Sequence, residues 1–194
     1  MEYFQEGGPF RKTLRMVTLE TERLILRMLQ DSDIDAFAEM CGDPEVMRYI
    51  GDGQPLARPV AWRRMAMMVG HWTLRGYGLW AAVEKSSGDL IGHIGFWNPD
   101  GWPGFEVGWS LRRSFWGCGH ATEGARKALH FAFTEMKQAQ VISLIHPQNA
   151  ASIRVALRLG ERMAGPIKVM GKAALKYCIT REEWATNDLS KNIR

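Results

Sequence analysis

The feature that most constrains the fold is a change of hydrophobic period in the middle of the chain, followed by a glycine loop. Apolar residues recur at helical spacing before this point. After it, three short apolar runs within residues 79–83, 90–97 and 105–111 are separated by turn residues, which predicts an antiparallel meander. Gly117 and Gly119 follow directly, and an amphipathic helix begins after them. The rest of the chain must fold around this order of strand, glycine loop and helix.

Further elements are expected on both sides of this segment. The residues up to about Val17 show neither period, and we interpret them as a flexible arm. A strand containing Leu24 and Leu26 precedes the first helix, and neither repeats nor low-complexity tracts are found. Helices are expected at residues 34–41, 59–74, about 121–137 and 149–160, and later strands at residues 141–145, 167–169 and 175–179. The fold class is therefore mixed α/β (α+β).

Size and composition favour one folded domain. The chain has 194 residues, 46% of them hydrophobic and 24% charged, which is typical of globular proteins and not of disordered or fibrous ones. No apolar run approaches the roughly 18 residues of a spanning helix, and no apolar signal segment is visible near the start. We therefore expect a cytoplasmic protein without a membrane partner.

Cysteines and charge exclude several classes of site. Cys41, Cys118 and Cys178 are widely spaced, which gives neither a disulfide framework nor a zinc motif, so we expect a reducing compartment and no metal. The net charge of +4 favours anionic ligands. It is far from the dense basic patch of a nucleic-acid-binding protein, so no nucleic-acid partner is expected.

The last strand of the meander has two unlike faces. Its aromatic and aliphatic residues alternate with Glu106, Gly108 and Ser110, which share the other face. A face of one acid and two small residues leaves room for a ligand. A solvent-exposed strand face is the alternative explanation.

The glycine loop is suited to a phosphate group. A loop between a strand and a helix N-terminus presents unpaired backbone N–H groups and the positive end of the helix dipole. The sequence contains no Gly-Lys-Ser/Thr, so the loop is not a Walker P-loop. Gly117 and Gly119 lack the third glycine of a Rossmann fingerprint and follow an antiparallel meander. A Gly-x-Gly loop alone is also consistent with a plain turn.

Two motifs nevertheless carry a family resemblance. Residues 106–111, Glu-Val-Gly-Trp-Ser-Leu, and residues 116–123, Trp-Gly-Cys-Gly-His-Ala-Thr-Glu, resemble the central strand and the acetyl-CoA pyrophosphate loop of GNAT N-acetyltransferases, more narrowly of the RimJ/RimL-like branch. Further pieces match in the same order at residues 21–27, 146–152, 159–160 and 179–184. The resemblance covers roughly residues 18 to 184.

The resemblance implies the architecture and the co-substrate. It implies a GNAT fold, with a mixed, mostly antiparallel sheet that splays open at the cofactor site and has flanking helices. Acetyl-CoA would lie in the gap. The acetyltransferase domain would span residues 18–184, between a flexible arm at residues 1–17 and a tail at residues 185–194.

Backbone groups are expected to make most of the cofactor contacts. Those of Trp109, Ser110 and Leu111 would pair with the pantetheine arm like an added strand. The pyrophosphate would be held by N–H groups of the loop and helix start, namely Gly117, Cys118, Gly119, His120, Ala121 and Thr122. A Cβ atom at either glycine would interfere with positive φ and with close approach of the phosphates. Arg112 and Arg113 are expected either to steer the anionic cofactor or to be an ordinary solvated pair.

The family reaction is direct attack of a neutral amine on the thioester in a ternary complex, which requires a base. Glu106 is the candidate, acting directly or through a water, with a substrate-orienting or solvated glutamate as the alternative. Asn149 matches a cofactor-contacting asparagine, although helix capping would also explain it. The acid of many members is a helix tyrosine, and that position is Ala156 here. Ser152 is the predicted replacement and Tyr177 the second choice.

Two other polar groups have competing interpretations. A helix N-terminus and the neighbouring His120 would favour a nucleophilic Cys118, but residues two apart on a phosphate loop seldom reach hydrogen-bond geometry. We expect Cys118 to be alkylated readily in the absence of CoA. His93 is interpreted as a structural histidine.

The acceptor is expected to be a primary amine bound near residues 40–78. A peptide or protein N-terminal amine, with a reference pKa of about 7.7–8.0, is easier to deprotonate than a small amine such as a polyamine, for which lysine at about 10.4 is the guide. A catalytically inactive sensor of acyl-CoA on the same fold is an alternative function, and a nucleotide-binding protein unrelated to CoA is a third. A homodimer is a further partner hypothesis.

Overall fold

A computed structural model describes residues 17–186. Residues 1–16 of the predicted arm and residues 187–194 of the predicted tail lie outside the described residues. Residues 185 and 186, which the sequence places in the tail, belong to the last helix.

The chain alternates between helices and strands. The helices are η1 (Asp31–Asp33), α1 (Ile34–Gly42), α2 (Pro44–Met47), α3 (Arg58–Arg75), η2 (Arg113–Phe115), α4 (His120–Thr134), α5 (Ala150–Arg158) and α6 (Arg181–Thr186). The strands are β1 (Leu19–Glu20), β2 (Leu24–Arg27), β3 (Leu79–Glu84), β4 (Leu90–Trp97), β5 (Glu106–Leu111), β6 (Gln140–Ile145), β7 (Arg162–Val169) and β8 (Lys172–Thr180).

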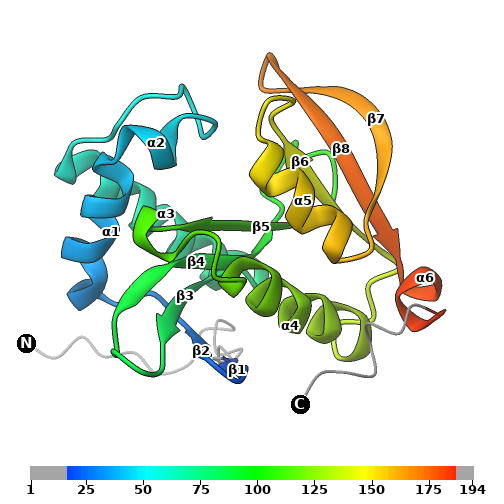
Figure 1. Ribbon diagram of the computed structural model, residues 1–194, viewed down its shortest axis with the longest axis horizontal. Helices are drawn as coiled ribbons and strands as arrows, with labels where there is room; N and C mark the ends of the chain where they lie inside the picture. Colours follow the sequence, from blue (N-terminus) through cyan, green and yellow to red (C-terminus); the bar gives the residue numbers. More distant parts are fainter. Residues whose placement is uncertain (1–16, 187–194) are drawn as a thin grey trace, which may run out of the picture.

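All eight strands form one sheet, in the order β1-β2-β3-β4-β5-β6-β8-β7. Every neighbouring pair is antiparallel except β5 and β6, which run parallel and share a single register pair, Glu106 with Ile142. The predicted meander is therefore confirmed as β3, β4 and β5. The sheet separates into two parts at β5 and β6, as Figure 1 shows.

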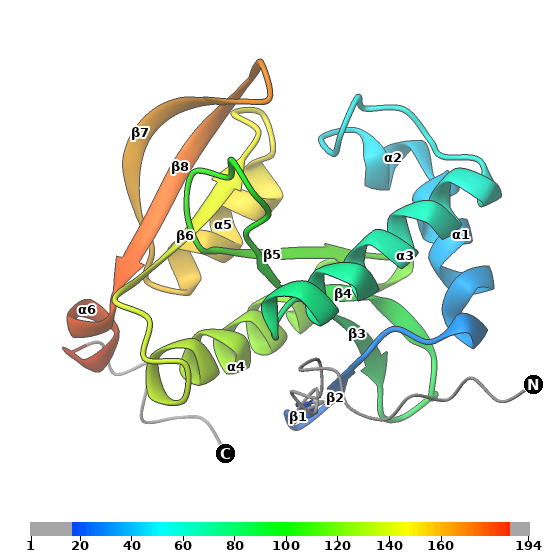
Figure 2. The ribbon, with the colours of Figure 1, turned by 180° about the vertical axis from the view of Figure 1, so that it is seen from behind.

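Helices cover both faces of the sheet. The helices α4 and α5 lie on one face (Figure 1), and α1 and α3 lie on the other (Figure 2). Two apolar clusters correspond to these layers. One gathers Leu129 of α4 with Trp80, Ile94 and Val107 of the sheet, and the other gathers Phe37 of α1 with residues of α3 and the opposite sheet face. The meander is thus held from both sides, which fixes the position of β5.

Several element boundaries differ from the sequence-based expectations. The helix expected to reach about Lys137 ends at Thr134, since Lys137 adopts a φ of 56° that a helix cannot continue. The first helix, α1, ends at Gly42, and Pro44 begins the short α2. A proline suits the first helical turn because its missing N–H has no intrahelical partner there, and Asp43 caps the helix by accepting from the Glu45 backbone N–H at 2.8 Å.

Candidate active site

The site is centred on the point where β5 and β6 diverge. Beyond the pair of Glu106 with Ile142, the two strands share no further register pair. Just beyond this pair, two hydrogen bonds that involve side chains connect β6 to β5. Ser143 Oγ donates to the Val107 carbonyl oxygen at 2.9 Å, and the Leu144 N–H donates to Glu106 Oε1 at 3.3 Å. The sheet therefore opens progressively from Glu106 towards the end of β5.

Glu106 lies on the face of β5 that the sequence analysis singled out. Its register partner Trp97 packs against the α1–α3 cluster, whereas Val107 is buried under α4. A Cβ atom added to Gly108 would meet no atom within 4 Å. The small-residue face therefore leaves open space beside Glu106, although Ser110 farther along is buried.

The environment of Glu106 favours a group that gains and loses a proton near neutral pH. Burial raises its pKa to about 7, against hydrogen bonds that lower it, from Trp102 Nε1 to Oε2 at 2.7 Å and from the Leu144 N–H. A carboxyl group with such a pKa can accept a proton from an amine at neutral pH and release it again. The contact with Trp102 was not predicted from the sequence.

A second buried carboxyl group lies next to this point. Glu161 is 2% exposed, and its Oε1 lies 3.0 Å from Ser143 Oγ. Burial, partly offset by the Ser143 hydrogen bond and increased by the charge of Glu106, raises its pKa to about 8. Sequence reasoning did not select Glu161, because no pattern around it, directly after the helix-ending Gly160, marks it as buried.

The backbone groups of β5 alternate between its two neighbouring strands. The Val107 carbonyl accepts from β6 at 2.9 Å, and the Arg112 N–H donates to Ile91 of β4 at 2.7 Å. Because successive residues of a strand turn their backbone groups to opposite edges, Trp109 and Leu111 turn theirs towards β6 and Ser110 turns its own towards β4. The backbone groups of Ser110 therefore face β4 and not the gap, contrary to the prediction that they pair with a ligand there.

The edge of β5 that faces the gap has few partners. The indole N–H of Trp116 donates to the Leu111 carbonyl at 2.8 Å. No strand pairs with Trp109 on the β6 side among residues 17–186. Its indole ring packs between the main core and the small cluster under α5. The gap therefore has an open strand edge on one side.

The glycine loop has the backbone conformation that its sequence predicts. Gly117 and Gly119 have φ values of 76° and 86°, which lie in the left-handed region that disfavours side chains. Gly119 is the N-cap residue of α4, so the first N–H groups of this 15-residue helix point into the loop. Loop and helix start together form a site of positive potential.

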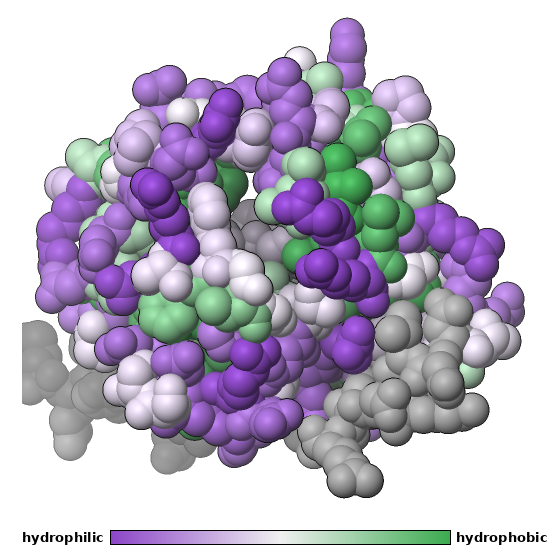
Figure 3. Space-filling model, in the orientation of Figure 1, coloured by the Kyte–Doolittle hydropathy of each residue, from purple (hydrophilic) through white to green (hydrophobic). Residues whose placement is uncertain are grey.

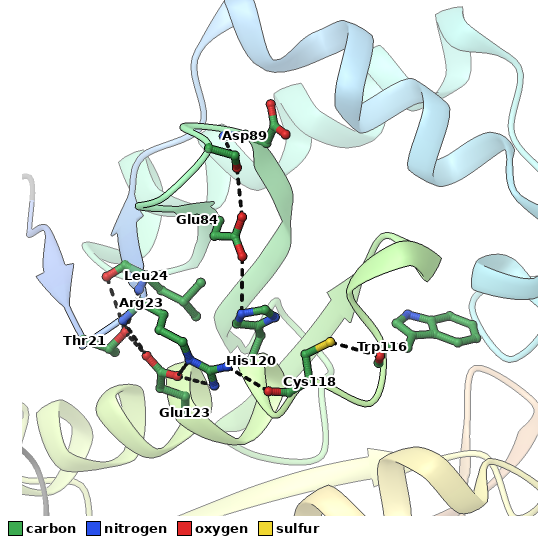
Figure 4. A network of polar contacts seen from close by, with 10 residues as sticks. Thr21, Arg23, Leu24, Glu84, Asp89, Trp116, Cys118, His120 and Glu123 are labelled. Carbon is green, nitrogen blue, oxygen red and sulfur yellow. Dashed lines mark hydrogen bonds and ion pairs between the residues drawn. The ribbon is translucent and has the colours of Figure 1, made fainter.

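An arginine from the start of β2 holds this loop in place, as Figure 4 shows. Arg23 Nη1 donates to the Cys118 carbonyl at 2.9 Å, and Arg23 Nε donates to Glu123 Oε2 at 2.6 Å. Burial raises the pKa of Glu123, but hydrogen bonds from Thr21 and Arg23 outweigh it, so the pKa lies below its ordinary value. Arg23 and Glu123 belong to matched motifs, but no local pattern predicts that they pair.

The remaining candidate residues lie at the start of α5 and within it. Asn149 caps α5, its Oδ1 accepting from the Ser152 backbone N–H at 3.1 Å, which agrees with the capping interpretation. Ser152 is partly buried. Ala156 is fully buried in a cluster with Tyr177, so the tyrosine ring of β8 packs where α5 carries only a methyl group.

The structure does not bring Cys118 and His120 together. The exposed Cys118 thiol donates to the Trp116 carbonyl at 3.5 Å, while the buried His120 ring lies 3.6 Å from Glu84, as Figure 4 shows. His93 packs against Phe37, and burial lowers its pKa to about 3. Within residues 17–186, no group of three or more candidate side chains is arranged to hold a metal ion.

Two contacts between distant segments involve the region where the sequence analysis expects the acceptor. Tyr49, after α2, stacks on His146, after β6, with ring centroids 4.9 Å apart. Lys172 at the start of β8 forms an ion pair with Asp52. Figure 3 shows a hollow between the surface over α1 and α2 and the surface over α5. Of the two tryptophans of α3, Trp62 is half exposed and Trp72 is buried in the core.

Comparison with known proteins gives one consistent result. The acetyltransferase (GNAT) domain family matches residues 23–162. The protein YkkB of Bacillus subtilis is 32% identical over 167 residues, which cover 82% of this chain and 93% of the relative. The N-acetyltransferase p20 of Bacillus licheniformis is 31% identical, over 81% of this chain and 89% of its own.

A solved structure agrees. The crystal structure of an acetyltransferase from Agrobacterium tumefaciens has a TM-score of 0.75 and 28% identity, and covers 92% of this chain and 98% of its own. In addition, no helix among residues 17–186 has the length and hydropathy needed to cross a membrane.

Proposed function

Because the chain belongs to the GNAT acetyltransferase family, we propose that it transfers the acetyl group of acetyl-CoA to a primary amine by direct attack in a ternary complex. The observation that carries the proposal is the position of Glu106, a carboxyl group with a pKa of about 7 where β5 and β6 part. The RimJ/RimL-like assignment rests on the sequence motifs.

In the proposed reaction, Glu106 accepts the proton that the amine loses, directly or through a water. The amine nitrogen forms a bond to the acetyl carbonyl carbon, the carbon–sulfur bond breaks, and CoA leaves as a thiolate that takes up a proton. Ser152 is proposed as the acid for that step, with Tyr177 as the alternative. A thiol with a pKa near the cysteine reference of about 8.5 also leaves readily without help.

The residues present fit acetyl-CoA. Trp109 and Leu111 turn backbone groups towards the gap, as an amide-rich arm requires. The pyrophosphate is proposed to bind the loop and helix N–H groups from Gly117 to Thr122. Asn149 Oδ1 caps α5, and its side-chain amide has no other hydrogen-bond partner within the described residues, so it is available to the cofactor. No metal is proposed.

We propose a peptide N-terminal amine as the preferred acceptor, ahead of a polyamine. A catalytic base works best when its pKa is near the operating pH, and near neutral pH an α-amine needs less help to lose its proton than an alkylamine does. The pKa of Glu106, about 7, is nearer the 7.7–8.0 of an α-amine than the roughly 10.4 of an alkylamine. The free, unpaired state of Cys41, Cys118 and Cys178 supports a reducing, cytoplasmic location. A homodimer stays a prediction.

A second function is favoured by one observation. Ala156 of α5 occupies the position at which the family resemblance implies a tyrosine acid, and its methyl side chain would suit a catalytically inactive domain that binds acyl-CoA and responds to it. Such a domain would bind acetyl-CoA without releasing CoA.

Two assays separate these functions. In thermal unfolding, acetyl-CoA at about 100 times its Kd should add about 2.7 kcal/mol to stability, whereas ATP and NAD should not. Thiol release should then depend on a short peptide with a free N-terminus or on spermidine. Binding without amine-dependent release would support the sensor, and no unfolding shift at millimolar acetyl-CoA would refute both.

A further inference from the structure

The buried Glu161 has no cationic partner. Its side chain is 2% exposed, and no arginine, lysine or histidine forms an ion pair with it within residues 17–186. Its Oε2 atom has no hydrogen-bond partner in that part of the chain. A carboxylate in this position would be an uncompensated buried charge, which is strongly unfavourable.

The hydrogen bonds of the neighbouring serine also indicate that Glu161 is protonated. Ser143 Oγ lies 2.9 Å from the Val107 carbonyl oxygen and 3.0 Å from Glu161 Oε1. A hydroxyl group has one proton and cannot donate to both oxygens. If Ser143 donates to Val107, the remaining contact is a hydrogen bond only when Glu161 carries a proton and donates it to Ser143.

The groups around Glu161 come from five elements. Glu106 on β5 is the charged neighbour that disfavours its ionisation. Cys178 on β8 has its pKa raised, by burial first and in smaller part by Glu183 and Glu161. Arg162 at the start of β7 pairs with Glu183 at 3.2 Å and is exposed. The other groups in contact with Glu161 are the hydroxyl of Ser143 on β6 and the Ala156 carbonyl on α5, which accepts from the Glu161 backbone N–H.

We propose that Glu161 is a positioning residue for the acetyl transfer: its protonated carboxyl group donates to Ser143, and Ser143 in turn ties β6 to β5 where Glu106 is held. The proposal rests on the proposed function, in which Glu106 is the base. The chain Glu161–Ser143–Val107 ends on the residue next to Glu106, and Leu144, next to Ser143, donates to Glu106 itself.

Loss of the proton would change the site in two ways. Ser143 would turn its hydroxyl proton to the Glu161 carboxylate, and the tie to Val107 would be lost. A second negative charge would also lie near Glu106. Glu161 must therefore stay protonated while Glu106 is ionised.

The first test measures whether Glu161 carries a proton in the folded protein. Wild type and Glu161→Gln are unfolded by denaturant between pH 5 and 8, with Glu182→Gln, an exposed glutamate of α6, as the control. Folding raises the pKa of Glu161 from 4.5 to about 8. Its stabilising contribution is therefore complete below pH 4.5 and is lost as the pH rises towards 8.

The ratio of the unfolding constants, wild type over Glu161→Gln, should thus rise about tenfold per pH unit in this range. The ratio of wild type to the control should stay constant. A pH-independent ratio for Glu161→Gln would mean that the folded protein holds no extra proton at this position, and the proposal would be wrong.

The second test measures the positioning of Glu106. The pH profile of kcat/KM is determined with acetyl-CoA and a short free-N-terminus peptide, using spermidine if the peptide is inactive. Wild type should lose activity above about pH 8, and Glu161→Gln should lack that alkaline loss, because a glutamine amide donates to Ser143 at every pH.

Two variants break the chain of hydrogen bonds from Glu161 through Ser143 to Val107. Glu161→Leu takes away the carboxyl group and Ser143→Ala takes away the relay, the second keeping the packing if the first fails to fold. Each should have a kcat about tenfold below that of Glu161→Gln at pH 7, with the Kd of acetyl-CoA kept. Equal kcat values for the glutamine and leucine variants, or the same alkaline loss in wild type and Glu161→Gln, would overturn the positioning role.

These outcomes are separable from a failure of the proposed function. If wild type releases no CoA with either amine, the proposed function fails and the positioning role falls with it. If wild type is active and the variants follow the wild-type profile, the function stands and only the role of Glu161 is refuted.

Discussion

At the scale of single residues, the account depends on how the protein sets the pKa of Glu106. Burial favours the neutral acid, and hydrogen bonds from Trp102 and Leu144 favour the carboxylate. The balance gives a pKa of about 7, at which both forms are populated near neutrality. Glu106 could be selected from the sequence because it is the one acid on the small-residue face of a strand.

Trp102 and Glu161 could not be selected in this way. Trp102 returns to Glu106 through a turn, and the burial of Glu161 depends on contacts with Ser143 and Ala156 that no local pattern encodes. Residue identity thus indicated the proposed base, while the groups that set its pKa required the tertiary structure.

Replacing Trp102 by phenylalanine should shift the pH dependence of the reaction. The indole N–H lowers the pKa of Glu106, so its loss should raise that pKa. A hydrogen bond to a charged group contributes about 1.5–3 kcal/mol, which corresponds to a shift of about one unit or more. The acidic midpoint of kcat/KM against pH should move upwards. An unmoved midpoint, equal to that of a Trp62→Phe control, would contradict the assigned contact.

At the scale of elements, the site is made by the parting of β5 and β6 together with the loop before α4. The order of strand, glycine loop and helix is readable from the sequence, because glycine spacing and a change of period are local signals. The hydrogen bonds from Arg23 to Cys118 and Glu123, which we call the clamp, could not be predicted from the sequence, since they join residues about a hundred positions apart.

Weakening the clamp should affect cofactor binding more than turnover. In Arg23→Gln the hydrogen bond to the Cys118 carbonyl is lost and the loop is less well fixed. Arg23 is partly exposed, so solvent screening limits the effect to about 1 kcal/mol, or roughly a fivefold rise in the KM for acetyl-CoA with kcat little changed. The exposed Arg162→Gln is the control. Identical KM values for acetyl-CoA in the two variants would contradict a role of Arg23 in cofactor binding.

Glycine substitutions should have opposite effects on stability in the loop and in a helix. Gly117→Ala places a Cβ atom at a φ of 76°, which costs about 1–2 kcal/mol. Gly70→Ala lies within α3 with no atom within 4 Å of the new Cβ, and should stabilise by about 0.5–1 kcal/mol. The free energies of unfolding from denaturant titrations test both, and a Gly117→Ala variant as stable as wild type would contradict the loop conformation.

At the scale of the whole molecule, two acids lie at the junction of β5 and β6 in the eight-stranded sheet: Glu106, which is half-buried, and Glu161, which is buried. The overall architecture follows from patterning, because buried strands and amphipathic helices are recorded in local sequence. The position of the opening, and the pairing of Glu106 with Ile142 alone, result from how β6 and β8 pack and so required the structure.

The two acids predict how stability depends on pH. Folding raises the pKa of Glu106 to about 7 and of Glu161 to about 8, so the stability they contribute is complete below pH 4.5 and is lost as the pH rises through 7 and 8. Folding lowers the pKa of His71, His93 and His130, so these histidines affect the pH dependence of stability only below about pH 6.5. Stability should therefore fall by roughly 2–2.5 kcal/mol between pH 6.5 and 8. A free energy of unfolding that rises over this range would contradict the assigned shifts.

The most direct test of the central claim compares wild type with Glu106→Gln, measuring amine-dependent release of CoA from acetyl-CoA and the Kd of acetyl-CoA. Loss of a general base should lower kcat by about 10²–10⁴-fold while the Kd stays the same. Turnover at the wild-type rate in Glu106→Gln would contradict the account.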